Sequence, residues 1–465
     1  MSNQVAEVSA KYLVEAAEKA VPVGYKQTEV GVIPEDWDVA TIEELAGIID
    51  PQPDHRTPPE SSNGEPYIGI SDFINSKEVD WTASRKIISK AVDKQEKSFQ
   101  LQKGDIVFGK IGTIGVPKFV PQVPFRFALS ANVILLQPKN IEPVYLMEFF
   151  YSELFQKTLK SELHSTSQAA FGMNKMRLIE LPLPPKEEQT AIANALSDVD
   201  ALIRELEKLI AKKQAIKTAT MQQLLTGRTR LPQFALREDG MPKGTKPSEL
   251  GEIPDDWEVH ALGSLCGYQN GKAQEQYFNS NDGYKVISIG NYSESGRYIE
   301  TGSYIDKQFK NEIGRFVLSC DDLTMILNDK TAVGTIIGRV LLIEADDTYV
   351  MNQRTMRLTP KEGVQSKFLH FLINSDSVHK RIVGMAKPGT QIYVNTDDVL
   401  EFNLIVPNSQ YEQTAIATIL SDMDAEIQAL EQRLGKTRQI KQGMMQELLT
   451  GKTRLIKSSK EVIHE

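Results

Sequence analysis

Apolar residues spaced three and four positions apart fill two long segments of this chain of 465 residues. The pattern predicts one helix over 188–225 and a second over 412–449. Each helix would carry a single apolar stripe of the kind that forms the seam of a coiled coil. The predicted seam residues are Ile192, Leu196, Val199, Ile203, Leu206 and Ile210 in the first helix, and Ile416, Leu420, Met423, Ile427, Leu430 and Leu434 in the second.

The two predicted helices need a partner for their apolar stripes. At about 1.5 Å per residue the first would be roughly 57 Å long, and a helix with one apolar stripe is not stable alone. Two matching stripes in one chain most simply bury each other, so we expect an antiparallel pair. The alternative is two unrelated surface helices, each lying on its own domain. Pro184 and Pro185 stand ahead of the first helix, and Gly227 and Gly451 end the two helices.

The helices belong to an internal repeat. Residues 188–230 and 412–454 agree at 25 of 43 positions, which is far more than two unrelated helices would share. A second repeated motif, at 31–37 and 251–257, ends in Trp37 and Trp257. The chain is therefore two tandem units, each with a Trp motif, a long middle and a long helix. The two middles hardly match, and a constant frame around variable inserts suggests one scaffold with two different recognition surfaces.

The middles combine short β-like runs with helical segments. Val107, Ile134, Val286, Met325 and Leu341 lie in such runs, with Gly and Pro between them. Helices are predicted near 143–160 and 366–382. The predicted fold class is mixed α/β, with two α/β domains joined by two long helices in an antiparallel coiled coil and related by a pseudo-two-fold repeat. The predicted segments are a tail or short helix at 1–24, a first domain at 25–183, a first helix at 184–230, a linker at 231–249, a second domain at 250–407, a second helix at 408–456 and a tail at 457–465.

Composition narrows the class of protein. The two cysteines, Cys266 and Cys320, exclude a disulfide framework and a cysteine zinc site. The sequence has neither a signal peptide nor a long apolar run, so we expect a cytoplasmic protein that does not span a membrane. The net charge of −9 is the main objection to a nucleic-acid partner. Basic residues nevertheless gather toward the ends of both repeated helices, as at Arg230 and Arg454.

Catalytic motifs are missing from the sequence. Gly451-Lys452-Thr453 has Gln446 where a P-loop needs glycine. The proline pairs do not fit the motif of DNA amino-methyltransferases, and no lysine has Asp or Glu two positions before it, as many restriction nucleases require. The glycines at 109, 112 and 115 are better explained as loop residues than as a dinucleotide fingerprint. Together these absences favour a binding protein.

Several motifs resemble the specificity (S) subunit of Type I restriction–modification enzymes, over nearly the whole chain from residue 31 onward. The most specific are Leu183-Pro184-Pro185-Lys186-Glu187-Glu188-Gln189 and the helix endings Leu224-Leu225-Thr226-Gly227 and Leu448-Leu449-Thr450-Gly451. Gly104-Asp105-Ile106-Val107-Phe108 and the pairs Ser167-Gln168 and Thr390-Gln391 are also typical. The second copy departs at Cys320-Asp321-Asp322 and at residues 407–411, which are expected to be turns.

The resemblance implies a DNA sequence-specificity subunit without catalytic activity. Each middle would be a target recognition domain for one half of a bipartite, asymmetric double-stranded DNA site, and the helices would hold the halves apart. Two modification subunits, which use S-adenosylmethionine, and two restriction subunits, which use ATP and Mg²⁺, would dock on it. The chain itself would bind no cofactor and no metal.

Loop residues suited to phosphates and base edges are the DNA-binding candidates. They are Lys110, Thr113, Gln168, Asn174 and Lys175 in the first middle, and Asn328, Lys330, Thr331, Gln353, Arg354, Gln391 and Asn395 in the second. Each could equally be a solvated loop residue. We expect Trp37 and Trp257 to pack each domain against its helix rather than to contact DNA.

Two other classes of protein compete with this hypothesis. One is a coiled-coil interaction or scaffold protein that does not bind DNA. The other is a fused restriction enzyme that has lost its catalytic half, which the absence of any remnant motif disfavours.

Overall fold

The computed structural model of the chain describes residues 21–53, 56–164, 171–279, 281–331, 333–387 and 391–456. It divides into two compact units. Unit 1 combines residues 1–207 with 433–465, and unit 2 is residues 208–432. Of the two predicted tails, only residues 21–24 fall within the described part of the chain.

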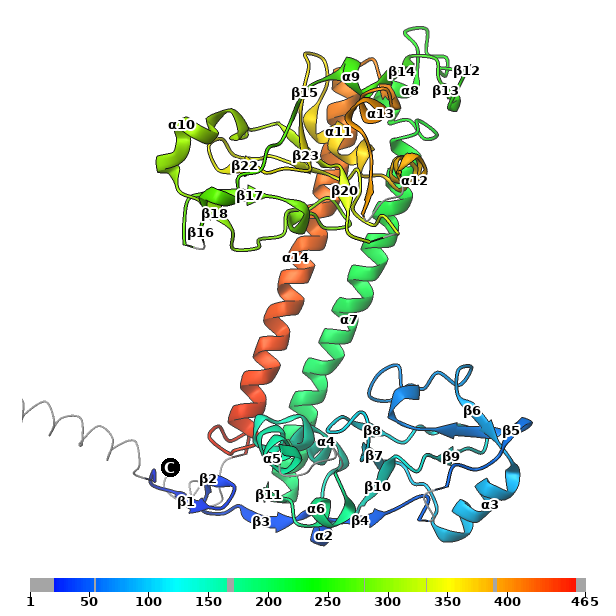
Figure 1. Cartoon of the computed structure of the whole chain (residues 1–465). Helices are drawn as coiled ribbons and strands as arrows, with labels where there is room; N and C mark the ends of the chain where they lie inside the picture. The colour runs from blue at the N-terminus through cyan, green and yellow to red at the C-terminus, as the bar shows by residue number, and fades with distance from the viewer. Residues whose placement is uncertain are drawn as a thin grey trace, which may run out of the picture. The chain divides into compact units, whose positions relative to one another are not determined.

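Two helices of 39 residues run through the repeat, as predicted: α7 (Lys186–Leu224) and α14 (Gln410–Leu448) (Figure 1). They are the longest helices among the described residues. No helix in that part of the chain is both long and apolar enough to cross a membrane. The prediction of a mixed α/β fold with two long packed helices is confirmed.

The helices pack antiparallel within each unit. In unit 1, Glu207 of α7 pairs with Arg438 of α14 at 2.6 Å, and Asp200 pairs with Lys441 at 2.8 Å. As residue numbers fall along one helix they rise along the other. Unit 2 follows the same rule, because Lys213 pairs with Glu426 at 2.6 Å and Lys217 with Asp424 at 2.7 Å.

Unit 1 contains a four-stranded sheet beside a three-stranded sheet. The first has the order β4-β10-β7-β8 and is antiparallel, and the second has the order β6-β5-β9, with β5 and β9 parallel. Their bounds are β4 (Ala46–Ile49), β5 (Glu60–Ile68), β6 (Arg85–Ile87), β7 (Ile106–Gly109), β8 (Pro117–Phe119), β9 (Ala128–Leu129) and β10 (Val133–Pro138). Two strand pairs complete the unit: β1 (Tyr25–Thr28) with β2 (Gly31–Pro34), and β3 (Asp38–Thr41) with β11 (Glu180–Leu183).

Unit 2 repeats this topology with different residues. The order β15-β23-β19-β21 matches the first sheet. The order β16-β18-β17-β22, again with one parallel pair, matches the second with β16 added beside β18. The bounds are β15 (Cys266–Asn270), β16 (Phe278–Asn279), β17 (Tyr284–Ile287), β18 (Tyr304–Ile305), β19 (Leu323–Ile326), β21 (Val340–Leu342), β22 (Tyr349–Met351) and β23 (Thr355–Pro360). Further strand pairs are β12 (Thr245–Ser248) with β13 (Gly251–Pro254), β14 (Trp257–Ala261) with β25 (Asn403–Pro407), and β20 (Asn328–Asp329) with β24 (Ile392–Tyr393). The structural repeat therefore includes the middles, whose sequences hardly match.

A turn that requires a residue with positive φ precedes β7 in unit 1 and β19 in unit 2. Different residues supply that backbone conformation in the two units. Gly104 has φ +94° in unit 1, and Asp321 takes φ +68° at the matching place in unit 2. Both turns are closed by the next aspartate, because Asp105 accepts from the Gln102 N–H at 2.8 Å and Asp322 from the Ser319 N–H at 3.0 Å. Asp tolerates the left-handed region better than most residues other than glycine, so the departure at 320–322 keeps the turn.

Each predicted helix in the middles is split in two. The structure has α4 (Pro143–Tyr151) and α5 (Glu153–His164) in unit 1, and α11 (Ser366–Ile373) and α12 (Asp376–Met385) in unit 2. The prediction of single helices over 143–160 and 366–382 was wrong. Ser152 and Ser375 are extended at the breaks, and their hydroxyls donate to the carbonyls of Phe149 and Leu372 at 2.6 and 2.7 Å. Serine competes in this way with the helical backbone.

The remaining helices are short. They are α2 (Ile42–Leu45), α3 (Ser89–Ser98) and α6 (Met173–Arg177) in unit 1, and α8 (Pro232–Ala235), α9 (Leu262–Leu265), α10 (Lys310–Ile313) and α13 (Thr396–Leu400) in unit 2.

Both cores take residues from both long helices. The core of unit 1 surrounds Trp37 and includes Leu196 from the start of α7 and Leu448 from the end of α14. The core of unit 2 surrounds Trp257 and includes Leu420 from the start of α14 and Leu224 from the end of α7. The predicted seam residues divide by exposure: Ile192, Leu196, Leu206, Ile210, Ile416, Leu420 and Ile427 are buried, and Val199, Ile203, Met423, Leu430 and Leu434 are half-buried.

We predict that Leu196→Ala lowers the free energy of unfolding by about 2–5 kcal/mol, because Leu196 is fully buried and truncation leaves a cavity. Leu202 of the same helix is 40% exposed, and Leu202→Ala is the matched control with a much smaller expected cost. Equilibrium urea unfolding of both variants measures the difference. Equal costs for the two variants would contradict the assignment of the buried stripe.

Candidate nucleic-acid interface

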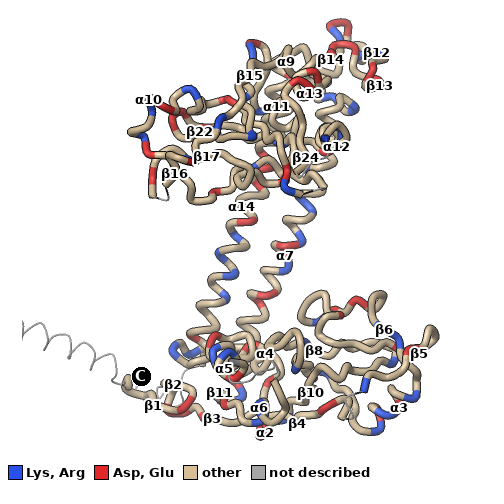
Figure 2. Tube along the Cα trace, in the orientation of Figure 1, with Lys and Arg blue, Asp and Glu red and all other residues tan. Residues whose placement is uncertain are grey.

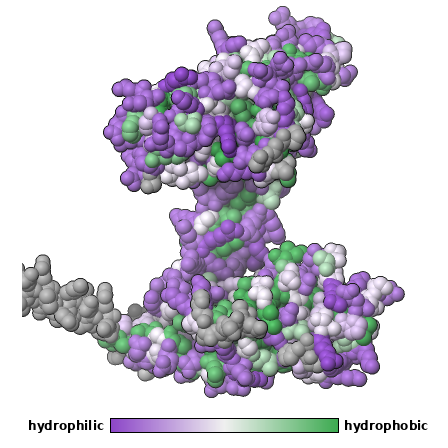
Figure 3. Space-filling view, in the orientation of Figure 1, coloured by the Kyte–Doolittle hydropathy of each residue, from purple (hydrophilic) through white to green (hydrophobic). Residues whose placement is uncertain are grey.

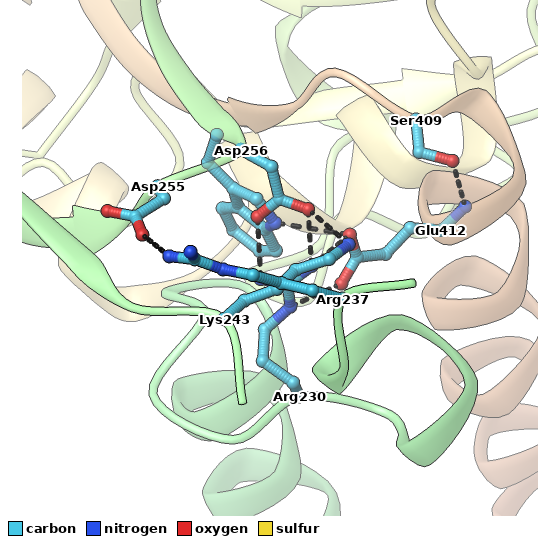
Figure 4. A network of polar contacts seen from close by, with 8 residues as sticks. Arg230, Arg237, Lys243, Asp255, Asp256, Ser409 and Glu412 are labelled. Atoms are coloured by element: carbon cyan, nitrogen blue, oxygen red, sulfur yellow. Dashed lines mark hydrogen bonds and ion pairs between the residues drawn. The ribbon is translucent and has the colours of Figure 1, made fainter. Parts of the chain in front are cut away.

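A half-buried arginine joins three parts of unit 2 (Figure 4). The Arg230 guanidinium donates to both carboxylate oxygens of Asp256, at 2.7 and 3.0 Å, and to both of Glu412, at 2.7 Å each. The Trp257 indole N–H donates to Glu412 at 3.2 Å. The end of the first repeat, the second Trp motif and the start of α14 are thus joined by one planar cation.

Unit 1 contains the same network, closed by the far end of the chain. Arg454 donates to both oxygens of Asp36 at 2.8 Å and to Glu188 at 2.8 and 2.7 Å. Trp37 donates to Glu188 at 3.0 Å. Both tryptophan side chains are completely buried. The prediction that they pack each domain against its helix is confirmed.

Local sequence explains why the networks form. Gly227 and Gly451 both have φ +70°, and a Cβ at either would lie 2.4 Å from Pro254 or Pro34 of the Trp motif. Only glycine fits this turn, and the turn carries the chain to the arginine three residues later. Glu188 and Glu412 lie in the first turns of α7 and α14, where the helix dipole favours a negative charge.

Hydrogen bonds from the cationic side chains lower the pKa of the aspartate in each network, although burial acts in the opposite direction. Burial alone would raise the pKa of the Asp256 carboxyl, but hydrogen bonds from Arg230 and Lys243 outweigh it and lower the pKa to about 2. In unit 1 the hydrogen bond from Arg454 lowers the pKa of Asp36 in the same way. Both arginines are occupied by carboxylates and are unsuited to phosphate binding. Sequence analysis placed both arginines among the basic residues at the helix ends and missed these networks. The available signal was the Thr-Arg pair that follows the glycine turn in both repeats.

The structure brings several candidate DNA-binding residues of unit 2 together beyond the ends of β19 and β23. The Arg354 guanidinium donates to the Gln391 side-chain oxygen at 2.7 Å, and Arg354 itself has φ +66°. The neighbouring Gln353 donates to Glu275 at 2.7 Å. Asn328 lies opposite Tyr393 in the β20–β24 pair. This cluster is exposed apart from Asn328 and Gln391, which are half-buried.

Other candidates of unit 2 lie at the edges of the cluster. Thr331 is bound through its N–H and hydroxyl to Asp329, at 2.8 and 2.9 Å. Lys330 is exposed beside it. Asn395 is exposed and donates to Asp398 at 3.1 Å.

In unit 1 the candidates have varied environments. Lys110 is buried and pairs with Asp50 at 3.0 Å, so its charge is already neutralised. Thr113 is exposed in the glycine loop, and exposed Asn174 accepts from Arg177 at 2.6 Å. Lys175 pairs with Glu162 at 2.9 Å. Gln168 lies outside the described residues.

Residues of both charge signs alternate along the long helices (Figure 2), and hydrophobic and hydrophilic residues are mixed on the visible face of each unit (Figure 3). Figure 2 shows cationic and anionic residues interspersed along α7 and α14. Figure 3 shows hydrophobic residues among hydrophilic ones on the visible face of each unit. Contacts to a polyanion would therefore depend on individual loops rather than on the net charge of −9.

Comparison with known proteins defines the class. Residues 34–218 and 254–442 each match the family described as the Type I restriction modification DNA specificity domain. The chain is 28% identical over 435 residues to the MjaVIII specificity subunit of Methanocaldococcus jannaschii, covering 91% of this chain and 94% of that protein. It is 27% identical over 190 residues to the EcoBI specificity subunit of Escherichia coli, covering 38% of each.

Solved structures share the fold. The S subunit of a Type I restriction–modification system from M. genitalium superposes with a TM-score of 0.54 at 15% identity, covering 89% of this chain and 96% of that one. A chain from a structure describing assembly of the Type I R-M system gives a TM-score of 0.51 at 14% identity, covering 90% and 99%.

The two matched segments span most of the chain, and it belongs to the family of Type I restriction–modification specificity subunits. It is the DNA specificity component of such a system and not a catalytic one.

We predict an acid-dependent loss of stability that depends on Asp256. Its folded pKa of about 2 lies below the ordinary 3.8, so its stabilising contribution is complete above pH 3.8 and is lost as the pH falls through about 2. The difference in unfolding free energy between wild type and Asp256→Asn should therefore shrink across this window in pH-resolved urea unfolding. Asp255→Asn is the control, because the Asp255 carboxylate pairs with Arg237 at the surface, where an ion pair contributes little. A difference that does not change with pH would contradict the assignment.

Proposed function

We propose that this chain recognises a bipartite, asymmetric double-stranded DNA site, with one half contacted by each middle. We assign residues 25–183 and 250–407 as the two target recognition domains, with 231–249 as their linker and α7 and α14 as the spacer between half-sites. Family membership argues against the alternative of a coiled-coil scaffold that does not bind DNA.

One observation carries the proposal: the sheets β4-β10-β7-β8 and β15-β23-β19-β21 share their strand order, while the loops at the same end of these sheets differ. In unit 1 the connection after β7 runs from Lys110 to Gly115. In unit 2 the connection after β19 runs from Leu327 to Gly338, includes β20 and is described except at residue 332. A common scaffold with different loops is what two unlike half-sites require.

The contacts of the candidate residues support different roles. Gln353, Arg354 and Gln391 form a polar cluster whose amide and guanidinium groups can hydrogen-bond base edges in the major groove. Thr113, Asn174, Lys330 and Asn395 are exposed and suited to phosphates or bases. Lys110 and Thr331 are better suited to holding their loops, because each is bound to an aspartate. Lys175 and Asn328 stay candidates for contacts beside these loops, and Gln168 stays a candidate from its sequence motif alone.

The partners follow from the same proposal. Two modification subunits using S-adenosylmethionine and two restriction subunits using ATP and Mg²⁺ would assemble on this chain, and their own residues would bind these cofactors. A DNA substrate of this kind favours a cytoplasmic setting.

We predict that exchanging residues 38–180 for the matching segment of another specificity subunit changes one half of the methylated site and leaves the other half unchanged. The reason is that each half-site is contacted by one unit. The chimaera is expressed with the modification subunits, and the modified sequence is determined by methylation-sensitive sequencing of cellular DNA. The reciprocal exchange in unit 2 is the control and should change only the other half. If either exchange altered both halves together, the modular proposal would be wrong.

A further inference from the structure

The loop that follows β7 in unit 1 and the loop that follows β19 in unit 2 occupy equivalent places in their sheets. Both loops end at a glycine with positive φ that packs beneath a helix. A Cβ at Gly115 would lie 2.3 Å from Leu159 of α5, and a Cβ at Gly338 would lie 2.4 Å from Ile382 of α12. The two loops therefore leave and rejoin the same scaffold positions although they differ in length.

The base of the unit 1 loop is fixed. The buried Lys110 ammonium pairs with Asp50, the Lys110 N–H donates to the Asn132 carbonyl at 2.8 Å, and the Phe171 N–H donates to the Lys110 carbonyl at 2.9 Å. The chain then folds so closely over Gly109 that a Cβ there would lie 1.9 Å from the Thr113 carbonyl oxygen. Next to this fixed base the Ile111 side chain is 50% exposed.

A different device fixes the unit 2 loop. Asp329 is 2% exposed and accepts hydrogen bonds from the N–H groups of Thr331 and Ile336, each at 2.8 Å. A Cβ at Gly334 would lie 2.8 Å from Ile392, so the loop also packs against β24, next to Gln391. Val333, beside this contact, is 75% exposed.

Single exposed aliphatic residues are common on protein surfaces. The role of Ile111 and Val333 must therefore be argued from their positions. Each is β-branched and stands on a loop whose base is fixed, so little side-chain freedom is lost on binding. Val333 lies in the loop that packs beside the Arg354–Gln391 pair, whose groups can bond base edges. An apolar side chain among such groups fits the one apolar feature of the major groove, the thymine 5-methyl group.

We propose that Ile111 and Val333 each contact a thymine 5-methyl group in their respective half-sites. The proposal rests on the proposed function and adds a specificity determinant in each unit. A side chain wedged between base pairs is the competing role for an apolar residue at DNA. The Val333 loop packs against β24 next to the Arg354–Gln391 pair, whose groups can bond base edges, and this favours the methyl contact.

The experiment uses the full chain assembled with its modification subunits and the site identified by sequencing of methylated DNA. Each thymine of that site is replaced in turn by deoxyuridine, which removes only the methyl group, and the dissociation constant is measured. One thymine in each half should show weakening of about fourfold, the value of one buried methyl-sized group at roughly 0.8 kcal/mol.

Variants assign each response to a residue. Ile111→Ala should abolish the response in one half-site only, and Val333→Ala in the other only. Val333→Thr keeps one methyl branch and should keep part of the response. Ile74→Ala and Ile299→Ala remove exposed aliphatic side chains of units 1 and 2 outside these loops and should leave both responses intact.

Failure of this proposal is distinct from failure of the proposed function. Specific binding that is insensitive to every uridine replacement, or a response unchanged in Ile111→Ala and Val333→Ala, would overturn the methyl contacts and leave DNA recognition standing. A half-site without thymine would overturn the contact in that half. Weakening by Ile111→Ala on all sequences alike, without a uridine response, would favour the wedge. Absence of any sequence-specific binding would instead refute the proposed function.

Discussion

The fold depends on a planar arginine held between two carboxylates at the end of each repeat. Arg230 joins Asp256 of the second Trp motif to Glu412 at the start of α14, and Arg454 joins Asp36 to Glu188 at the start of α7. Glu188 and Glu412 are buried, and each also accepts from a tryptophan N–H. Removing one partner of such a pair would leave a buried charge uncompensated, which typically costs about 3–5 kcal/mol. The network therefore fixes where each long helix begins relative to its recognition domain.

This constraint separates what is shared by the units from what differs. Both units share the arginine–carboxylate network, the glycine turn beneath Pro34 or Pro254, and the strand order of the β4-β10-β7-β8 and β15-β23-β19-β21 sheets. The loops that follow β7 and β19 share only the positions at which they leave and rejoin the scaffold. Lys110 with Asp50 fixes one loop and Asp329 fixes the other. A rigid frame of this kind lets loop residues change without disturbing the helix pair, as the proposed recognition of two unlike half-sites requires.

Sequence analysis predicted the features that depend on local periodicity and failed where distant partners decide. The helices and their buried stripes follow from three-and-four spacing, and the structure has them within two residues of the predicted bounds. The common topology of the middles was not predictable, because a left-handed turn can use Gly104 or Asp321 and a strand can use many apolar residues. Lys110 looked like an exposed loop cation, but its partner Asp50 lies 60 residues away in sequence. The breaks at Ser152 and Ser375 likewise depend on serine hydroxyl bonds within an otherwise continuous helical pattern.

The central claim is that two domains on one scaffold contact two separate DNA segments. Hydroxyl-radical footprinting of the chain with its modification subunits on its methylation site tests this most directly. The account predicts two protected segments with a less protected spacer, their centres on the order of one helical turn, about 34–36 Å, apart or a multiple of it. Exchanging one middle should leave the distance between the segments unchanged. A single continuous protected segment, or one unit without any protection, would contradict the account.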